Sequence, residues 1–283
     1  NFSDESKGSP IGPSAATLEA MRSQALLYAF YMDEKNKAIT ILQQVAGSPK
    51  ASREIKAQSK LDMGDIYILM NEPWESTLLY AQVEKAHKEE PVGYEAKLRN
   101  AKLSYYKGDF QLAQDHLDVL KEATTREIAN DAMSLSLLIQ NNTVLDTSGA
   151  AMQAYADVEL MLFQNKQESA LQKLDSMLAD YKGHPLEDEV YWLMAKVQMQ
   201  LGNFEQSLDK LDKINQSYNY DILGDDALFM TGRIYEEQLK DTEKAMELYT
   251  QFLREYPGSI YVADVRKRFR NLRGDFNINW TIV

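Results

Sequence analysis

The sequence contains no cysteine, which excludes disulfides, thiolate nucleophiles and metal sites built on cysteine. Glycine and proline number only 13 and 7 in 283 residues, as expected of a chain that is almost entirely helical. No apolar run approaches the roughly 18 residues that a membrane-spanning helix needs. Basic residues (31) are fewer than acidic ones (43), and the net charge of −12 disfavours binding to nucleic acids because it repels their phosphates.

The sequence also lacks the motifs of enzymes and metal proteins. It has no glycine-rich phosphate loop, no HExxH motif, no nucleophile elbow and no calcium loop. Its three histidines, His87, His116 and His184, are far apart and have no acidic or histidine partner at a ligand spacing. His184 lies in a Gly-His-Pro sequence, and we interpret it as a loop residue. We therefore expect a protein that is not an enzyme, with no catalytic residues, no cofactor and no metal.

The clearest positive pattern is a helical hairpin that occurs twice between residues 188 and 257. In each copy a small residue of the first helix is followed 12 or 13 positions later by a small residue of the second helix, and an earlier hairpin has the same spacing. The pairs are Ala101 with Ala113, Ala195 with Ser207, and Gly232 with Ala245. Small residues let two helices approach closely, and a unit of about 34 residues is typical of helix–turn–helix arrays.

Residues 63–67 (Met-Gly-x-x-Tyr) and 231–235 (Thr-Gly-x-x-Tyr) resemble the Leu-Gly-x-x-Tyr core of the tetratricopeptide repeat (TPR) family. Two residues depart from the family pattern, Gln198 where a tyrosine is expected and Ser207 where alanine is usual. The resemblance implies an all-α, right-handed solenoid of helical hairpins. It also implies a scaffold whose partner is a protein or a peptide segment.

The end of the chain resembles a narrower group. Residues 252–261 read Phe-Leu-x-x-Tyr-Pro-x-Ser-x-Tyr. This is similar to the segment joining repeats in bacterial periplasmic TPR proteins, such as the Tol–Pal coordinator and the assembly lipoprotein of the outer-membrane β-barrel machinery. Residues 162–166 are similar to long TPR proteins of Bacteroidetes-type bacteria. The resemblance implies a periplasmic or outer-membrane-associated protein of cell-envelope assembly, and the cytoplasm is the alternative.

Apolar periodicity predicts about fourteen helices in two similar halves, each of three hairpins followed by a capping helix. A polar, turn-rich segment joins the halves, either rigidly or as a hinge. The predicted segments are a flexible leader (1–13), a first half (14–141), the joint (142–149), a second half (150–273) and an apolar tail (274–283). We also expect that residue 1 is not the natural start of the protein.

Several boundaries are predicted from local sequence. Ser14 and Ser259 are the expected N-caps of the first and last helices, and Gly274 is the expected C-cap of the last one. A lone helix is expected over 127–140. The alternation of apolar and polar residues in 276–283 has the period of a β-strand.

The groove of a TPR protein is lined by the first helix of each hairpin. Alignment of its groove positions to Ala195 and Gly232 predicts two sets of partner-binding residues. The first set is Glu189, Trp192, Lys196, Met199 and Gln200, and the second is Asp226, Phe229, Arg233, Glu236 and Glu237. Aromatic rings flanked by charges of both signs suit a protein segment. This mixed set differs from the basic set with which carboxylate-clamp TPR proteins hold chaperone tails.

One basic block stands out in the acidic sequence, and we name it the basic cap. It consists of Arg266, Lys267, Arg268, Arg270 and Arg273 in the last predicted helix. Cations near a helix C-terminus are stabilised by the helix dipole, so a solvated face is the simpler interpretation. A docking surface for an acidic partner or an anionic surface is the alternative.

Two functions thus follow from the sequence. The first is a non-enzymatic scaffold that holds a protein segment in its groove. The second is a structural element that oligomerises, in which the tail 276–283 adds a strand to a partner sheet or fills the groove of a neighbouring copy. The oligomeric state itself is left open.

Overall fold

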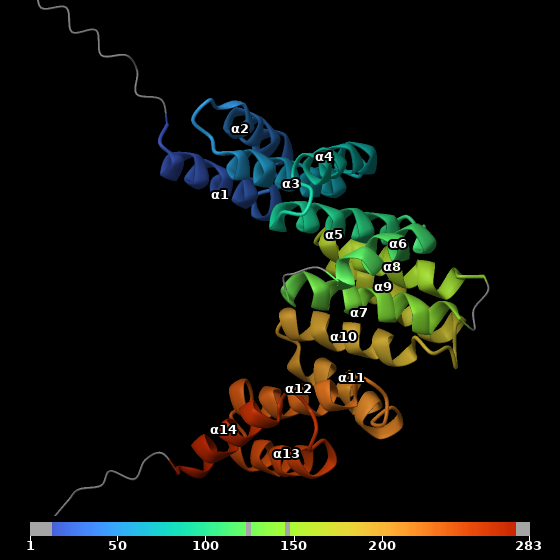
Figure 1. Cartoon of the computed structure of the whole chain (residues 1–283). Coiled ribbons are helices and arrows are strands. Elements are labelled where there is room, and N and C mark those ends of the chain that lie inside the picture. The colour runs from blue at the N-terminus through green and yellow to red at the C-terminus, as the bar shows by residue number, and fades with distance from the viewer. Residues whose placement is uncertain (1–12, 123–125, 145–147, 276–283) are drawn as a thin grey trace, which may run out of the picture. The chain divides into compact units, whose positions relative to one another are not determined.

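The computed structural model describes residues 13–122, 126–144 and 148–275. Within these ranges the chain forms fourteen α-helices and no strand, which confirms the predicted all-α fold and the helix count. Consecutive helices pack against each other within each part of the chain, as in a helical-repeat solenoid (Figure 1). None of the described helices is long and apolar enough to cross a membrane. The leader and the predicted tail strand fall mostly outside the described residues.

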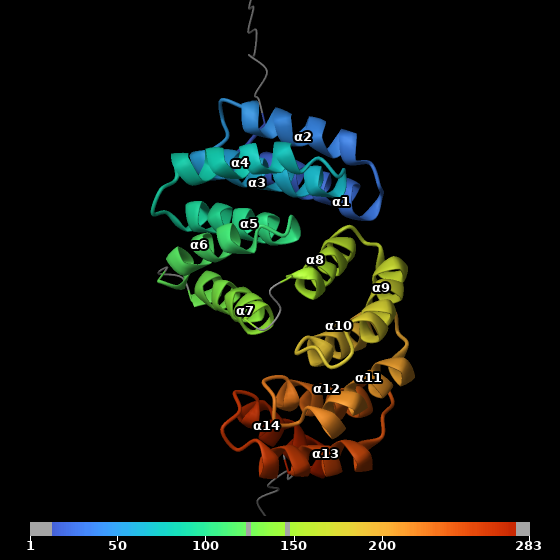
Figure 2. The ribbon, with the colours of Figure 1, turned by 90° about the vertical axis from the view of Figure 1, so that its right-hand side faces the viewer.

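The chain divides into two compact units, the first ending at Lys166 and the second beginning at Gln167. The first unit contains helices α1 (Ala15–Tyr31), α2 (Lys35–Gly47), α3 (Arg53–Leu69), α4 (Pro73–Ala86), α5 (Pro91–Tyr106), α6 (Phe110–Lys121), α7 (Arg126–Thr143) and α8 (Ala150–Phe163). The second unit contains α9 (Gln167–Asp180), α10 (Glu187–Gln200), α11 (Phe204–Ser217), α12 (Gly224–Glu237), α13 (Thr242–Glu255) and α14 (Val262–Arg273). The division therefore lies one helix later than the predicted joint at 142–149, because α8 packs with the first unit (Figure 2).

In the first unit, alternate helices pack side by side as well as along the chain. Helix α3 contacts both α1 and α5, and α5 also contacts α7. We call these four helices, α1, α3, α5 and α7, the first-helix layer, since each of the first three opens a hairpin. The layer holds the candidate sites of this unit.

Close approach within the hairpins explains the small residues of the sequence pattern. An added Cβ at Gly64 on α3 would lie 2.3 Å from the ring of Tyr80 on α4, and one at Gly232 would lie 2.6 Å from Tyr249. Both tyrosines are fully buried. Ser207, which departs from the family pattern, is buried and donates a hydrogen bond of 2.9 Å to the Ala195 carbonyl oxygen. The hydroxyl is thus satisfied by the backbone of the facing helix.

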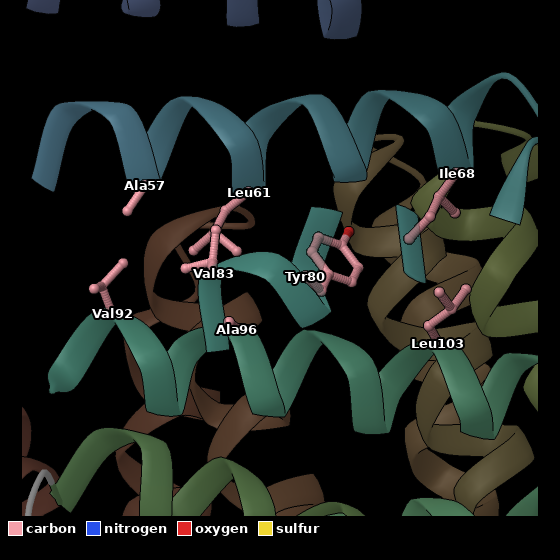
Figure 3. Packing of buried hydrophobic residues seen from close by; sticks show 8 residues of the cluster. All are labelled: Ala57, Leu61, Ile68, Tyr80, Val83, Val92, Ala96 and Leu103. Carbon is pink, nitrogen blue, oxygen red and sulfur yellow. The ribbon is translucent and has the colours of Figure 1, made fainter. Parts of the chain in front are cut away.

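The hydrophobic core of the first unit follows the same hairpins. Figure 3 shows one cluster in which side chains from three helices converge. Ala57, Leu61 and Ile68 come from α3, Tyr80 and Val83 from α4, and Val92, Ala96 and Leu103 from α5. Leu160 and Phe163 of α8 pack against this cluster, which is the reason that α8 belongs to the first unit.

Four helix ends are predicted above, and the structure confirms two of them, Ser14 and Gly274. The Ser14 side chain accepts a hydrogen bond from the Thr17 backbone N–H, and Gly274 ends α14 in the left-handed conformation with φ of 83°. The prediction for Ser259 is wrong, because α14 begins only at Val262 and the serine hydroxyl accepts from Tyr261 N–H before the helix.

The predicted end of the lone helix near residue 140 is also wrong, because α7 continues to Thr143. The Asn142 side chain donates to the Leu138 carbonyl and the Thr143 hydroxyl to the Ile139 carbonyl. These polar side chains therefore donate hydrogen bonds to carbonyl oxygens of the preceding turn, and the helix continues through them.

Candidate protein-binding surfaces

The first predicted groove set lies on one helix of the second unit. Glu189, Trp192, Lys196 and Met199 of α10 are half-buried, and Gln200 is exposed. The ammonium of Lys196 lies over the Trp192 ring, 5.6 Å from its centroid. One part of the Trp192 ring packs against the core of α10, α11 and α12, and the rest remains exposed beside the cation. The role of this pair in binding stays a prediction.

The second predicted set lies on α12, and α14 packs over it. The Phe229 side chain is only 8% exposed, and its ring stacks on Tyr261 with centroids 4.6 Å apart. The Tyr261 hydroxyl donates a hydrogen bond of 2.6 Å to Asp226. Burial, followed by this hydrogen bond, raises the pKa of Tyr261. Asp226 and Phe229 are thus already engaged by the last helix.

The carboxylates of the same set are engaged in the same way. Arg268 of α14 donates to Glu236 at 3.0 Å and to Glu237 at 2.7 Å, and it also pairs with Asp264. Glu237 is in addition paired with Arg233 at 2.9 Å. These partners lower the pKa of Glu237, through its hydrogen bond with Arg233 first. Of the ten predicted groove residues, Phe229 on α12 is buried, whereas Trp192, the aromatic residue on α10, is half-buried.

The basic cap divides into two groups. Arg268 and Arg273 pair with carboxylates of the chain, the latter with Asp275. Arg266, Lys267 and Arg270 are exposed, and within the described part of the chain they form no ion pair. A solvated face and a docking surface are both compatible with this arrangement.

A cleft of about 520 Å³, which is absent from the predicted sites, lies on the first-helix layer, and we name it the first-helix cleft. Its charged lining comes from α3, α5 and α7 and consists of Glu54, Glu95, Arg99, Lys102, Glu127 and Asp131. Its apolar lining consists of Pro91, Val92, Leu98 and Ile128. Three consecutive first helices thus contribute to one surface.

The signal for this cleft was present in the sequence. Aligning Ala101 with Ala195 places Glu95, Leu98 and Lys102 at the positions of Glu189, Trp192 and Lys196. All three of these α5 residues line the cleft. The repeat pattern is strongest in the second half of the chain and weaker in the first half, so the equivalent residues of α5 stand out less clearly in the sequence.

A polar network lies behind the cleft. Arg99 donates to Asp65 at 2.8 Å and to Glu95 at 2.6 Å, and the Tyr80 hydroxyl donates to Asp65 at 2.6 Å. On α1, Arg22 pairs with Asp62. Burial raises the pKa of Asp65 to about 6, although Arg99 and Tyr80 act in the opposite direction. The network ties α1, α3, α4 and α5 together.

Helix α8 already occupies another part of the first-helix layer. The Phe163 ring meets Phe30 of α1 edge-on, with centroids 6.2 Å apart, and lies 6.4 Å from Tyr106 of α5. The side chains of Gln164 and Asn165 donate to the carbonyl oxygens of Ile68 and Phe30, at 3.0 and 3.2 Å. A helix of the chain is therefore held by the carboxyl ends of α1, α3 and α5, with an aromatic anchor and backbone hydrogen bonds.

His87 and His184 form hydrogen bonds with residues close to them in the sequence. His87 is buried and hydrogen-bonds Glu90 at 2.7 Å, a local contact between residues three positions apart. His184 lies in a turn, as predicted, and its Nδ1 accepts from the Leu186 N–H. Within the ranges that the structure describes, no group of histidine and acidic residues has the arrangement of a metal site.

Comparison with known families gives one match. Residues 226–259 match the tetratricopeptide repeat family, over α12, α13 and the turn that follows. The match and the helical-repeat fold support a TPR protein, whose fold typically serves as a non-enzymatic scaffold for protein–protein interaction. A comparison with curated proteins found no significant match.

Proposed function

We propose that the chain is a non-enzymatic scaffold that holds a protein or peptide segment on the first helices of its repeats, in the bacterial cell envelope. The observation that carries this proposal is the combination of the TPR match with a helical-repeat fold whose first helices present accessible aromatic and charged side chains. In the second unit the presenting helix is α10, where Trp192 supplies apolar area and the Glu189 and Lys196 charges set the register of a bound segment.

The site on α10 is tested by truncating its aromatic–cation pair. Trp192→Ala combined with Lys196→Ala removes the side chains that a partner would contact. Because the Trp192 ring also packs partly against the core of α10, α11 and α12, the free energy of unfolding of this variant is measured in urea alongside binding. Phe229 is unsuitable for this purpose, because truncation of a buried phenylalanine costs about 3–5 kcal/mol of stability and would confound binding with unfolding.

The control is Trp74→Ala combined with Lys107→Ala in the first unit, a pair of the same chemistry with a more exposed tryptophan. There too a lysine lies over a tryptophan, 4.8 Å from the ring centroid, and the tryptophan is 79% exposed. Each tagged protein, after a check of its circular dichroism, is used to capture partners from a bacterial envelope extract. We expect the variant on α10 to retain about a tenth of the captured partner and the control to retain nearly all of it.

Equal capture by both variants would remove α10 from the proposal and leave the first-helix cleft and the basic cap as surfaces to test. If the unchanged chain captures no protein above empty resin, the scaffold function itself is contradicted. The envelope assignment is tested separately by protease treatment of cells that carry the tagged protein. We expect cleavage once the outer membrane is permeabilised, and cleavage only after complete lysis would place the protein in the cytoplasm.

A further inference from the structure

We infer that the first-helix cleft binds a basic segment of a partner protein, with lysine or arginine side chains flanking an apolar one. The inference rests on the proposed scaffold function and assigns the chemistry of the partner for the first unit.

Charge is the first argument. The cleft is lined by four carboxylates and two cations. Both cations are already neutralised within the chain, since Arg99 pairs with Asp65 and Glu95, and Lys102 lies 3.5 Å from Asp131. A partner therefore meets a surface whose cations are engaged.

Two of the four carboxylates that line the cleft keep their charge available to a partner. Glu54 in the first turn of α3 and Glu127 in the first turn of α7 are exposed, and they form no ion pair within the described ranges. A carboxylate in the first turn stabilises its own helix, and this accounts for each residue alone. It does not account for their convergence on one cleft with Glu95, where cations from a partner are favoured by the sum of the charges.

The apolar part of the cleft is the second argument. Pro91 is exposed and Ile128 is half-buried, whereas Val92 and Leu98 beneath them belong to the buried core. An apolar side chain of a partner can therefore contact Pro91 and Ile128 while its flanking cations reach Glu54 and Glu127. Free cations such as polyamines would use only the carboxylates, so the mixed lining favours a polypeptide.

Continuity with an existing interface is the third argument. The first-helix layer already holds a polypeptide segment, α8, at the carboxyl ends of α1, α3 and α5, whereas the cleft lies toward the amino ends of α3, α5 and α7. The α8 contacts therefore leave the amino-terminal half of the layer open. A partner segment there would extend a surface that the chain uses for its own helix.

The test uses the full chain and a short fluorescein-labelled peptide of lysine, leucine and glutamine, with a matched peptide in which glutamate replaces lysine. Binding is followed by fluorescence anisotropy. The cleft variant is Glu54→Gln with Glu127→Gln. The control is Glu75→Gln with Glu205→Gln, two exposed carboxylates that also lie in first turns, of α4 and α11, and carry the same total charge.

We expect the lysine peptide to bind the cleft variant about tenfold more weakly than the unchanged chain, while the control stays within about twofold. The glutamate peptide should not bind. Equal weakening by both variants would show attraction to the net charge alone and would overturn the inference, as would equal binding of both peptides or no binding of the lysine peptide.

Light scattering of the unchanged chain adds one more outcome. A mass above the monomer that falls to the monomer in the cleft variant would overturn the partner assignment and make a second copy the occupant. The cleft variant is also used in the envelope experiment. If it captures as much partner as the unchanged chain, this inference is refuted and the scaffold function still stands.

Discussion

At the scale of single residues, one close contact in each of two hairpins sets the helix spacing. Gly64 and Gly232 face the rings of Tyr80 and Tyr249, at distances that no Cβ can occupy without movement. The tyrosine hydroxyls are satisfied by carboxylates on the facing helix, Asp65 in the first case and Glu236 in the second. The glycine and the tyrosine of each hairpin thus depend on each other, and a substitution of either one alone disturbs the packing of the two helices.

Gly64→Ala tests this contact. The new methyl group would lie 2.3 Å from the Tyr80 ring, so α3 and α4 must separate, and we expect a loss of about 1–3 kcal/mol in the free energy of unfolding. The matched control is Gly47→Ala at the end of α2, where nothing lies within 4 Å of the added atom. It should be neutral or stabilising by up to about 1 kcal/mol. The free energy of unfolding of both variants is measured by urea unfolding. Equal stability of the two would show that the close contact at Gly64 does not set the spacing of α3 and α4.

Asp65 predicts a dependence on pH. Burial raises its pKa in the folded chain to about 6, above the ordinary aspartate value of about 4. Between these values the folded state binds more protons than the unfolded state, so the free energy of unfolding decreases as pH rises through this window. The contribution is fully favourable below about pH 4 and is lost above about pH 6.

The measurement is urea unfolding of the unchanged chain and of Asp65→Asn between pH 4 and pH 7. Relative to the variant, the unchanged chain should lose on the order of 2 kcal/mol as pH rises across this range. Parallel curves for the two proteins would show that Arg99 and Tyr80 offset the burial of the carboxylate, and a relative gain by the unchanged chain would show that they outweigh it.

At the scale of elements, two helices differ from the simple repeat. Helix α14 and its N-cap residue close the second unit, because Tyr261 and Arg268 pack onto α12 and cover predicted groove positions. Helix α8 lies on the first-helix layer and not within a hairpin of the second half. In both cases a helix of the chain occupies a surface that the repeat pattern alone assigns to a partner.

Phe163→Ala tests how α8 is held. The substitution removes the ring contacts with Phe30 and Tyr106, and we expect a loss of about 2 kcal/mol, less than for a fully buried phenylalanine because Phe163 is half-buried. Phe163→Leu keeps most of the apolar volume and should lose less than half of this. Stability is measured by urea unfolding, and limited proteolysis should show faster cleavage around α8 in the alanine variant. An alanine variant as stable and as resistant as the leucine variant would show that the ring does not anchor the helix.

At the scale of the whole molecule, each unit has its own hydrophobic core and its own accessible first-helix surface. The first unit presents a cleft with free carboxylates, whereas the second presents Trp192 beside Lys196 on α10. The two surfaces occupy equivalent positions of the repeat, as the alignment of Ala101 with Ala195 shows. A scaffold built in this way offers two different chemistries on one chain.

The sequence by itself determined the helical class, the number of helices and the small positions at the hairpin contacts. These features depend on neighbours along the chain, through apolar periodicity, turn residues and a fixed spacing between helices that pack as hairpins. One local signal erred where side chains hydrogen-bonded the backbone, as Asn142 and Thr143 do in extending α7.

Only the tertiary structure decided which predicted groove residues remain accessible. Whether Phe229 faces a partner or a helix of its own chain depends on where α14 packs, and the first-helix cleft depends on the convergence of α3, α5 and α7. The repeat spacing marks the α5 residues of this cleft, but it does not say which residues of α3 and α7 join them, because these contacts connect residues far apart in the sequence and depend on burial and charge in three dimensions.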